Sequence, residues 1–166
     1  MPTARSEVAA AAIGSRIFVV GGIDGFGKTL ATVEVYDTIS DIWTKLVDLP
    51  QPRHHAAAAV LDGVLYIIGG MSDLAGKPAA DVFVFYEGSN EWQMKASLPT
   101  PRGALATALI DRKIYAIGGI GPLGVTSELA VFEPDENKWE IKTQALNKRD
   151  HLAAASINEK LYVAGG

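Results

Sequence analysis

Eight residues near the N-terminus could form a phosphate-binding loop. Gly22 to Thr29 read Gly-Ile-Asp-Gly-Phe-Gly-Lys-Thr, which fits the pattern G-x-x-x-x-G-K-[ST] after an apolar segment. Phosphate binding also needs a helix directly afterwards, because the N–H groups at a helix N-terminus face the phosphates. The next segment, 32–36, reads as a strand by alignment with equivalent segments later in the chain. We therefore interpret the match as a coincidence within a glycine-rich loop.

Three imidazoles form the second set of side chains that could do chemistry, as metal ligands or as acids and bases. They are His54, His55 and His151. His55 and His151 each lie two residues after an arginine, and Glu7 and Ala104 stand at the matching positions elsewhere. No third ligand is evident at ligand spacing, so we predict no metal site and no cofactor.

The remaining chemistry is limited by composition. The 166 residues contain no cysteine, which excludes disulfides, thiolate metal sites and a cysteine nucleophile. The carboxylates fall mainly at predicted turns and form no convincing catalytic pair, so an enzyme is the less favoured interpretation. A net charge of −4 without a basic stripe argues against nucleic acid as a partner. The apolar runs are only strand-length, so we expect no membrane partner. The N-terminus carries no signal peptide, which would make the protein cytoplasmic if Met1 is the true start.

A repeat with a period near 50 residues organises all of these side chains. Glycine pairs recur at spacings of 48, 49 and 47 residues, and each pair begins 16 residues after an arginine. A tryptophan follows in each of the first three copies, seven residues after an aromatic residue. The glycine pairs begin at Gly21, Gly69, Gly118 and Gly165, and the arginines are Arg5, Arg53, Arg102 and Arg149. Such a fixed period indicates a repeat architecture.

One copy reads as four short antiparallel strands. In the second copy these are 56–61, 64–68, 82–85 and a shorter strand from Trp92, joined by turns such as Asp62-Gly63. The first strand of every copy is rich in alanine, although alanine is a poor strand former. Crowding explains this choice if several sheets converge on one axis, as in a β-propeller. The paired glycines would then allow close backbone approach.

These residues resemble the kelch repeat. The resemblance rests on the arginine, the small apolar strand, segments such as Leu65-Tyr66-Ile67-Ile68-Gly69-Gly70, and the aromatic and tryptophan in register. It implies an all-β fold, a partial kelch β-propeller with three full four-stranded blades and the first half of a fourth. The predicted domain is 1–166, with repeats 5–52, 53–101, 102–148 and a half repeat 149–166.

Three and a half blades would leave apolar sheet faces open to water. We therefore expect a fragment of a longer propeller, and the rival hypothesis is a homodimer in which two copies close a ring. The mass in solution decides between them, because a stable monomer contradicts the half-ring.

The resemblance also suggests where a partner binds. In kelch proteins, the loops before the first strand and those between the second and third strands share one face, which commonly docks a protein or peptide. The length of the second loop varies between copies, as recognition loops often do. Repetition of the arginines at every blade also fits a scaffold contact. The alternative function is a kelch-type enzyme acting on a sugar, similar to sialic acid mutarotases. The candidate binding residues are Glu7, His54, His55, Gly103, Asp150 and His151, with the adjacent Arg53, Arg102 and Arg149.

Overall fold

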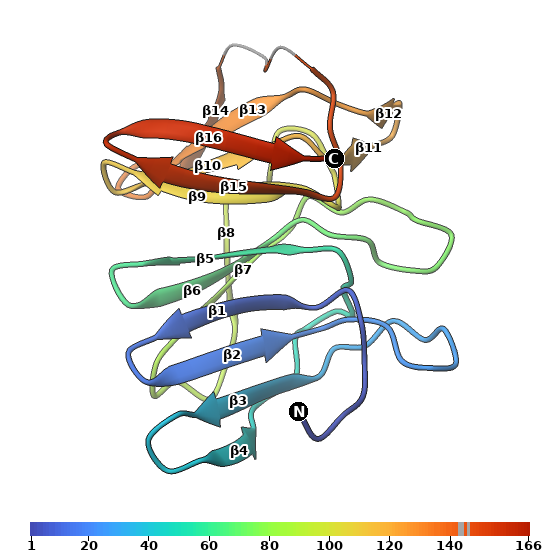
Figure 1. Ribbon diagram of the computed structural model, residues 1–166, viewed down its shortest axis with the longest axis vertical. Helices are drawn as coiled ribbons and strands as arrows, with labels where there is room; N and C mark the ends of the chain where they lie inside the picture. The colour runs from blue at the N-terminus through green and yellow to red at the C-terminus, as the bar shows by residue number, and fades with distance from the viewer. Residues whose placement is uncertain (143–144, 146) are drawn as a thin grey trace.

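The computed structural model describes residues 1–142, 145 and 147–166, and among these residues it contains strands but no helix. Three antiparallel sheets have four strands each, and a two-stranded hairpin follows them (Figure 1). The first sheet consists of β1 (Ala9–Ile13), β2 (Arg16–Val20), β3 (Val33–Asp37) and β4 (Ile42–Lys45). The second consists of β5 (Ala57–Leu61), β6 (Val64–Ile68), β7 (Val82–Tyr86) and β8 (Gln93–Lys95). The third consists of β9 (Ala106–Ile110), β10 (Lys113–Ile117), β13 (Leu129–Glu133) and β14 (Lys138–Ile141).

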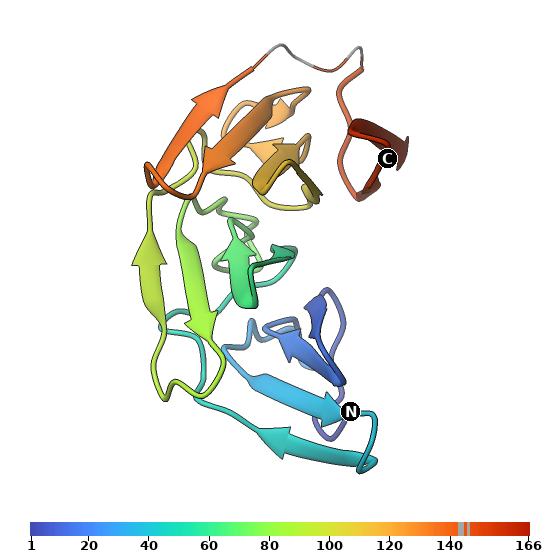
Figure 2. The ribbon, with the colours of Figure 1, turned by 90° about the vertical axis from the view of Figure 1, so that its left-hand side faces the viewer.

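The last hairpin is formed by β15 (Leu152–Ile157) and β16 (Lys160–Gly165). A second, small hairpin lies in the loop of the third sheet and pairs β11 (Ile120–Gly121) with β12 (Gly124–Val125). The repeat pattern predicts four strands per copy and does not predict this additional hairpin. Seen end-on, the sheets fan around a common axis in an open arc (Figure 2). The strands β1, β5, β9 and β15 lie side by side at the inner edge of the fan. The fold class is therefore the predicted one, a partial propeller of four-stranded blades.

The apolar core fills the gaps between neighbouring sheets. In β6, Leu65 and Ile67 face the first sheet, whereas Tyr66 and Ile68 face the third. All four are buried because successive side chains of a strand point to opposite faces, and both faces of this sheet are covered. On the inner strands, several of the buried side chains are alanines, including Ala57 and Ala59. Crowding at the axis thus accounts for the alanine-rich first strands.

The glycine pairs join each sheet to the next. The amide of Gly22 donates to the carbonyl of Arg53 at 2.8 Å, and Gly119 donates to Arg149 at 2.8 Å. A Cβ on Gly69 would collide with the carbonyl oxygen of Arg102. A side chain at these positions would therefore force neighbouring sheets apart.

The tryptophans also connect neighbouring sheets at the outer side of the fan. The indole nitrogen of Trp139 donates to the carbonyl of Ala96 at 2.8 Å, and its ring lies 5.1 Å from that of Phe132. Trp92 binds the carbonyl of Val47 in the same way at 3.2 Å. The recurring tryptophan and aromatic thus position one sheet against the next.

Candidate functional site

Two kinds of loop meet at one end of the sheets, which we call the loop face. Backbone bridges join the segment before each first strand to the start of the loop after the glycine pair: Ser6 to Ile23, His54 to Met71, and Gly103 to Ile120. The long loops project from the right-hand side in Figure 1, opposite the tight hairpin turns. The sequence placed the candidate binding residues at this junction.

Four residues at this junction have left-handed backbone conformations. They occupy the matching position in the four copies, two residues after the arginine, and have φ values of 53°, 53°, 53° and 51° for Glu7, His55, Ala104 and His151. Non-glycine residues rarely adopt such values without support from their surroundings. Here the amide of each later residue donates to the carbonyl of the residue before it in the series, at 3.1, 2.8 and 2.9 Å. These hydrogen bonds place the four residues next to one another around the axis.

Three of these side chains converge, and we call them the axial cluster: Glu7, His55 and His151. One ligand atom from each lies within 4.8 Å of those of the other two. His55 Nε2 is 3.1 Å from Glu7 Oε2, and the rings of His55 and His151 meet edge to face with centroids 4.9 Å apart. Ala104 stands between the two histidines in the series, and its methyl group leaves room for the rings to touch. The convergence therefore involves residues 144 positions apart in the sequence.

Two further residues of the predicted binding face, His54 and Asp150, form hydrogen bonds to the histidines of the axial cluster. His54 is buried, and its ring binds both His55 Nδ1 at 2.5 Å and the carbonyl of Asp73 at 2.9 Å. Asp150 accepts a hydrogen bond from Nδ1 of His151 at 2.7 Å. Burial lowers the pKa of His55; the charge of Glu7 opposes this shift, and the neighbouring histidines His54 and His151 add to it. His55 is thus favoured in its neutral form, with a lone pair available.

The arginines of the first three copies point into the interior rather than toward the loop face. The side chains of Arg53 and Arg102 are buried and pair with Asp81 and Glu128, respectively. Arg5 binds Glu34 at 2.5 Å in the same way. These guanidinium groups join the start of each repeat to its third strand or the loop before it and are out of reach of a partner.

One of these pairs shifts the pKa of its carboxyl group. Burial raises the pKa of Glu34, but hydrogen bonds from Thr3 and Arg5 and the charge of Arg5 outweigh it, so the net pKa is lowered. Glu34 therefore stays ionised inside the protein.

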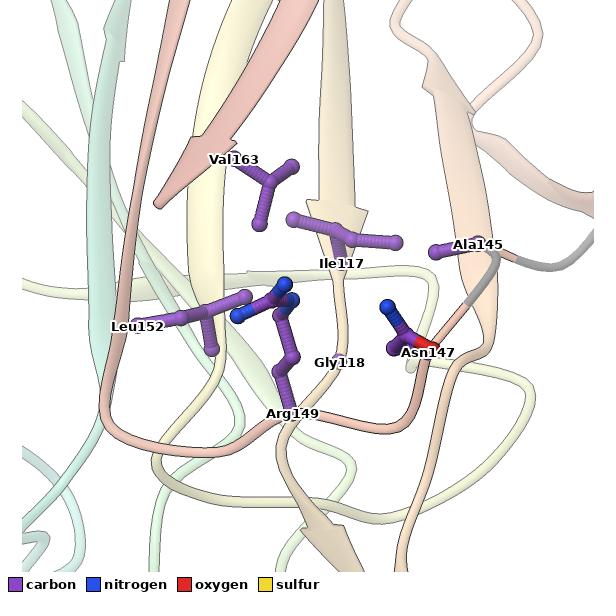
Figure 3. A pocket seen from close by; sticks show the side chains of 7 residues that line it. All are labelled: Ile117, Gly118, Ala145, Asn147, Arg149, Leu152 and Val163. Atoms are coloured by element: carbon purple, nitrogen blue, oxygen red, sulfur yellow. The ribbon is translucent and has the colours of Figure 1, made fainter. Parts of the chain in front are cut away.

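Gly103 and Arg149 have other surroundings. Gly103 is buried against the side chain of Met71, where a Cβ would approach within 2.9 Å of it. Arg149 donates to the carbonyl of Gly165 at 2.5 Å and lines a hollow between the third sheet and the last hairpin (Figure 3). The lining of this hollow includes none of the axial cluster. Of the nine candidate residues, five therefore gather around the axis: Glu7, His54, His55, Asp150 and His151.

The loop face also carries apolar side chains that the sequence reasoning did not single out. Phe26, Leu74 and Leu123 are 99%, 60% and 102% exposed. Each is the fourth residue after the second glycine of its pair, so they occupy matching tips of three successive loops. Their shared offset was visible in the sequence, but only the structure shows that all three point into solvent.

The segment that fits the phosphate-loop pattern is not arranged to hold a phosphate. The amides of Phe26 and Lys28 both donate to the carboxylate of Asp24 at 2.9 Å. The segment leads into strand β3 instead of a helix. The amide donors that would cradle a phosphate are thus occupied by an internal carboxylate.

Comparison with known proteins agrees with this architecture. The profile of the KLHDC2/KLHL20/DRC7 Kelch-repeats domain matches residues 1–166. The chain belongs to the kelch-repeat family. Among curated kelch-type relatives, beta-scruin of Limulus polyphemus is 38% identical over 72 residues, which is 43% of this chain and 8% of that protein. Human Kelch-like protein 34 is 45% identical over 71 residues, which is 42% of this chain and 11% of that protein.

The fold is also found in a solved protein. The chain titled "Structure of YjhT" superimposes with a TM-score of 0.83 at 19% identity, over 98% of this chain and 57% of that one. At this identity the likeness concerns the fold alone. This kelch chain thus spans just over half of that structure, and its matches cover a small part of the curated relatives' lengths. In the described part of the chain no helix is long and apolar enough to cross a membrane.

Proposed function

We propose that this kelch chain is a binding scaffold that docks a protein or peptide on its loop face. The observation that carries the proposal is the row of exposed apolar tips, Phe26, Leu74 and Leu123, on three neighbouring loops. Large apolar side chains exposed together on one face mark a surface that a partner covers. The tips of the first two loops are close, because a Cβ on Gly27 would lie 2.9 Å from the Leu74 side chain.

The loops begin at backbone bridges on the sheets, which suits recognition by a preformed surface. The start of each loop is held by a backbone bridge, while the loops differ in length and sequence. Burying a phenylalanine or leucine side chain contributes about 1.5–3 kcal/mol, so each tip could change an affinity roughly tenfold or more. The chemistry that fits is an extended or helical peptide with apolar side chains spaced to meet the three tips.

Selection of peptides from a displayed library against the chain tests this proposal. The best peptide should lose at least about tenfold in Kd when Phe26, Leu74 and Leu123 are all replaced by serine. Ile39→Ser is the matched control, because Ile39 is 84% exposed but lies in the β3–β4 turn at the opposite end. Peptides that bind the triple variant as tightly as the unmodified chain would place the docking surface elsewhere.

An enzyme acting on a sugar is the second candidate function, and the axial cluster is the observation in its favour. A carboxylate and two imidazoles within 4.8 Å could pass protons to and from a sugar hydroxyl. Measuring the interconversion of sialic acid anomers by NMR, with the chain and with its Glu7→Gln variant, tests this function. A rate equal to that without protein would exclude this reaction.

A further inference from the structure

The hydrogen bonds around His54 and His55 determine which ring nitrogens carry protons. The carbonyl of Asp73 can only accept, so Nε2 of His54, 2.9 Å away, is the protonated nitrogen. With its proton on Nε2, His54 has a lone pair on Nδ1, and Nδ1 of His55 donates to it across 2.5 Å. This assignment leaves the lone pair of His55 on Nε2, the nitrogen that lies 3.1 Å from Glu7.

At the axis, this lone pair meets other electron-pair donors. Nε2 of His55 lies 3.1 Å from the carboxylate oxygen of Glu7. On His151, Nδ1 donates to Asp150, so its lone pair is on Nε2. Glu7, His55 and His151 therefore supply one carboxylate and two imidazole rings with a free lone pair, and one ligand atom of each lies within 4.8 Å of those of the other two. Such an arrangement is stabilised by a cation that accepts all three.

The sequence offered no third ligand and predicted no metal site, but Glu7 supplies that ligand across the axis. From this geometry we propose that the axial cluster binds one divalent transition-metal ion, with Glu7, His55 and His151 as its protein ligands. Zinc bonds to nitrogen and oxygen of about 2.0–2.2 Å in a tetrahedron separate neighbouring ligand atoms by about 3.4 Å. The Glu7–His55 pair, at 3.1 Å, is already close to this separation. The widest separation of 4.8 Å has to shrink by about 1.4 Å, which rotation of the exposed Glu7 and His151 side chains can supply.

The surroundings of the cluster resemble those of natural metal sites. Metal-bound histidines usually donate a hydrogen bond from the N–H of their second ring nitrogen to a carboxylate, a carbonyl or a similar acceptor, which fixes the ring orientation. Asp150 accepts such a hydrogen bond from Nδ1 of His151, and Nδ1 of His54 accepts one from Nδ1 of His55. Three protein ligands leave a fourth position open, and imidazole with carboxylate suits Zn²⁺ and its neighbours in the first transition row. The bound ion would sit at the axis of the loop face.

Calorimetric titration of the metal-free chain with Zn²⁺ at neutral pH tests the proposal. We expect one ion per chain, and at least about tenfold weaker binding in each of Glu7→Gln, His55→Asn and His151→Asn. Asparagine is chosen because it tolerates the positive φ of 53° and 51° at the two histidines. Glu136→Gln, which removes an exposed carboxylate from the β13–β14 turn, is the matched control and should bind as the unmodified chain does.

A further substitution tests whether Asp150 orients the His151 ring without binding the ion itself. Asp150→Ala keeps all three proposed ligands and should weaken binding about 10–100-fold through loss of ring orientation. Circular dichroism spectra of the metal-free variants, identical to that of the unmodified chain, show that each variant is folded. Absence of Zn²⁺ binding, or equal affinity in the three ligand variants and the control, would overturn the proposal.

Discussion

Replacing Arg102 by methionine removes a positive charge from the interior while keeping most of the side-chain length. The Arg102 side chain is fully buried, pairs with Glu128, and donates to the carbonyl of Ala116 at 3.2 Å. Burial lowers the pKa of Arg102, and the charge and hydrogen bond of Glu128 oppose this shift. After the substitution, Glu128 still accepts the hydrogen bond from the Thr100 hydroxyl at 2.7 Å but loses the positive charge of Arg102.

The expected loss in the free energy of unfolding follows from this environment. Removing one partner of a buried ion pair costs about 3–5 kcal/mol, because the other charge stays buried without compensation. With a urea dependence of about 2 kcal/mol per M, a loss of about 4 kcal/mol lowers the midpoint by about 2 M. That is a large part of the roughly 5–15 kcal/mol that keeps a domain folded.

Urea denaturation followed by tryptophan fluorescence measures this loss. Arg112→Met is the matched control, because Arg112 pairs with Asp62 at the surface with side chains 72% and 52% exposed. Exposed pairs contribute about 0–1 kcal/mol, so the control should move the midpoint by less than about 0.5 M. The double variant Arg102→Met with Glu128→Gln should be less destabilised than the sum of its single variants. If Arg102→Met and Arg112→Met shift the midpoint equally, the buried pair of Arg102 and Glu128 does not stabilise the fold more than an exposed pair does.

Three further predictions concern the backbone, the pH dependence and the glycine-rich loop. Gly69→Ala should lower the free energy of unfolding by at least about 2 kcal/mol, because the φ of Gly69 is +63° and a Cβ would collide with the carbonyl of Arg102. The control Gly25→Ala should change stability little, because open space surrounds Gly25. Equal urea midpoints of the two variants would contradict this prediction. Because the folded pKa of Glu34 is lowered, its contribution to stability is complete above the ordinary carboxyl pKa and disappears as the pH falls through the lowered value. Urea midpoints between neutral and acidic pH should therefore fall less steeply in Glu34→Gln, and an unchanged slope would refute this role. Addition of ATP with Mg²⁺ should leave the melting temperature unchanged, because the loop amides already bind Asp24; a ligand at 100 times its Kd would add about 2.7 kcal/mol, which a thermal melt would detect.

The repeat itself was predictable from the sequence because its physical causes are local. A glycine pair, an aromatic and a tryptophan at fixed offsets specify turns, close approaches and strand partners within one sheet or to the next. Asp62-Gly63 marks a hairpin whose strands are found as expected. The small hairpin formed by β11 and β12 was missed, because Ile120–Val125 is short and lacks a regular alternation.

The candidate site depended on distances between sheets, which no single repeat encodes. The sequence identified Glu7, His55 and His151 as matching positions, but not that they meet across the axis. Their separation depends on the angle between successive sheets, and that angle is set by the side chains packed between each pair of sheets. The same angle places Arg53 and Arg102 inside the protein.

The sequence by itself thus determined the family and the strands of the four-stranded sheets, since these follow from residue types at fixed spacing. Only the tertiary structure decided which polar side chains converge, which are buried, and which apolar tips, such as Phe26, remain exposed. The physical reason is that pattern and turn chemistry act over a few residues, whereas convergence and burial are set by the packing of whole sheets around a common axis.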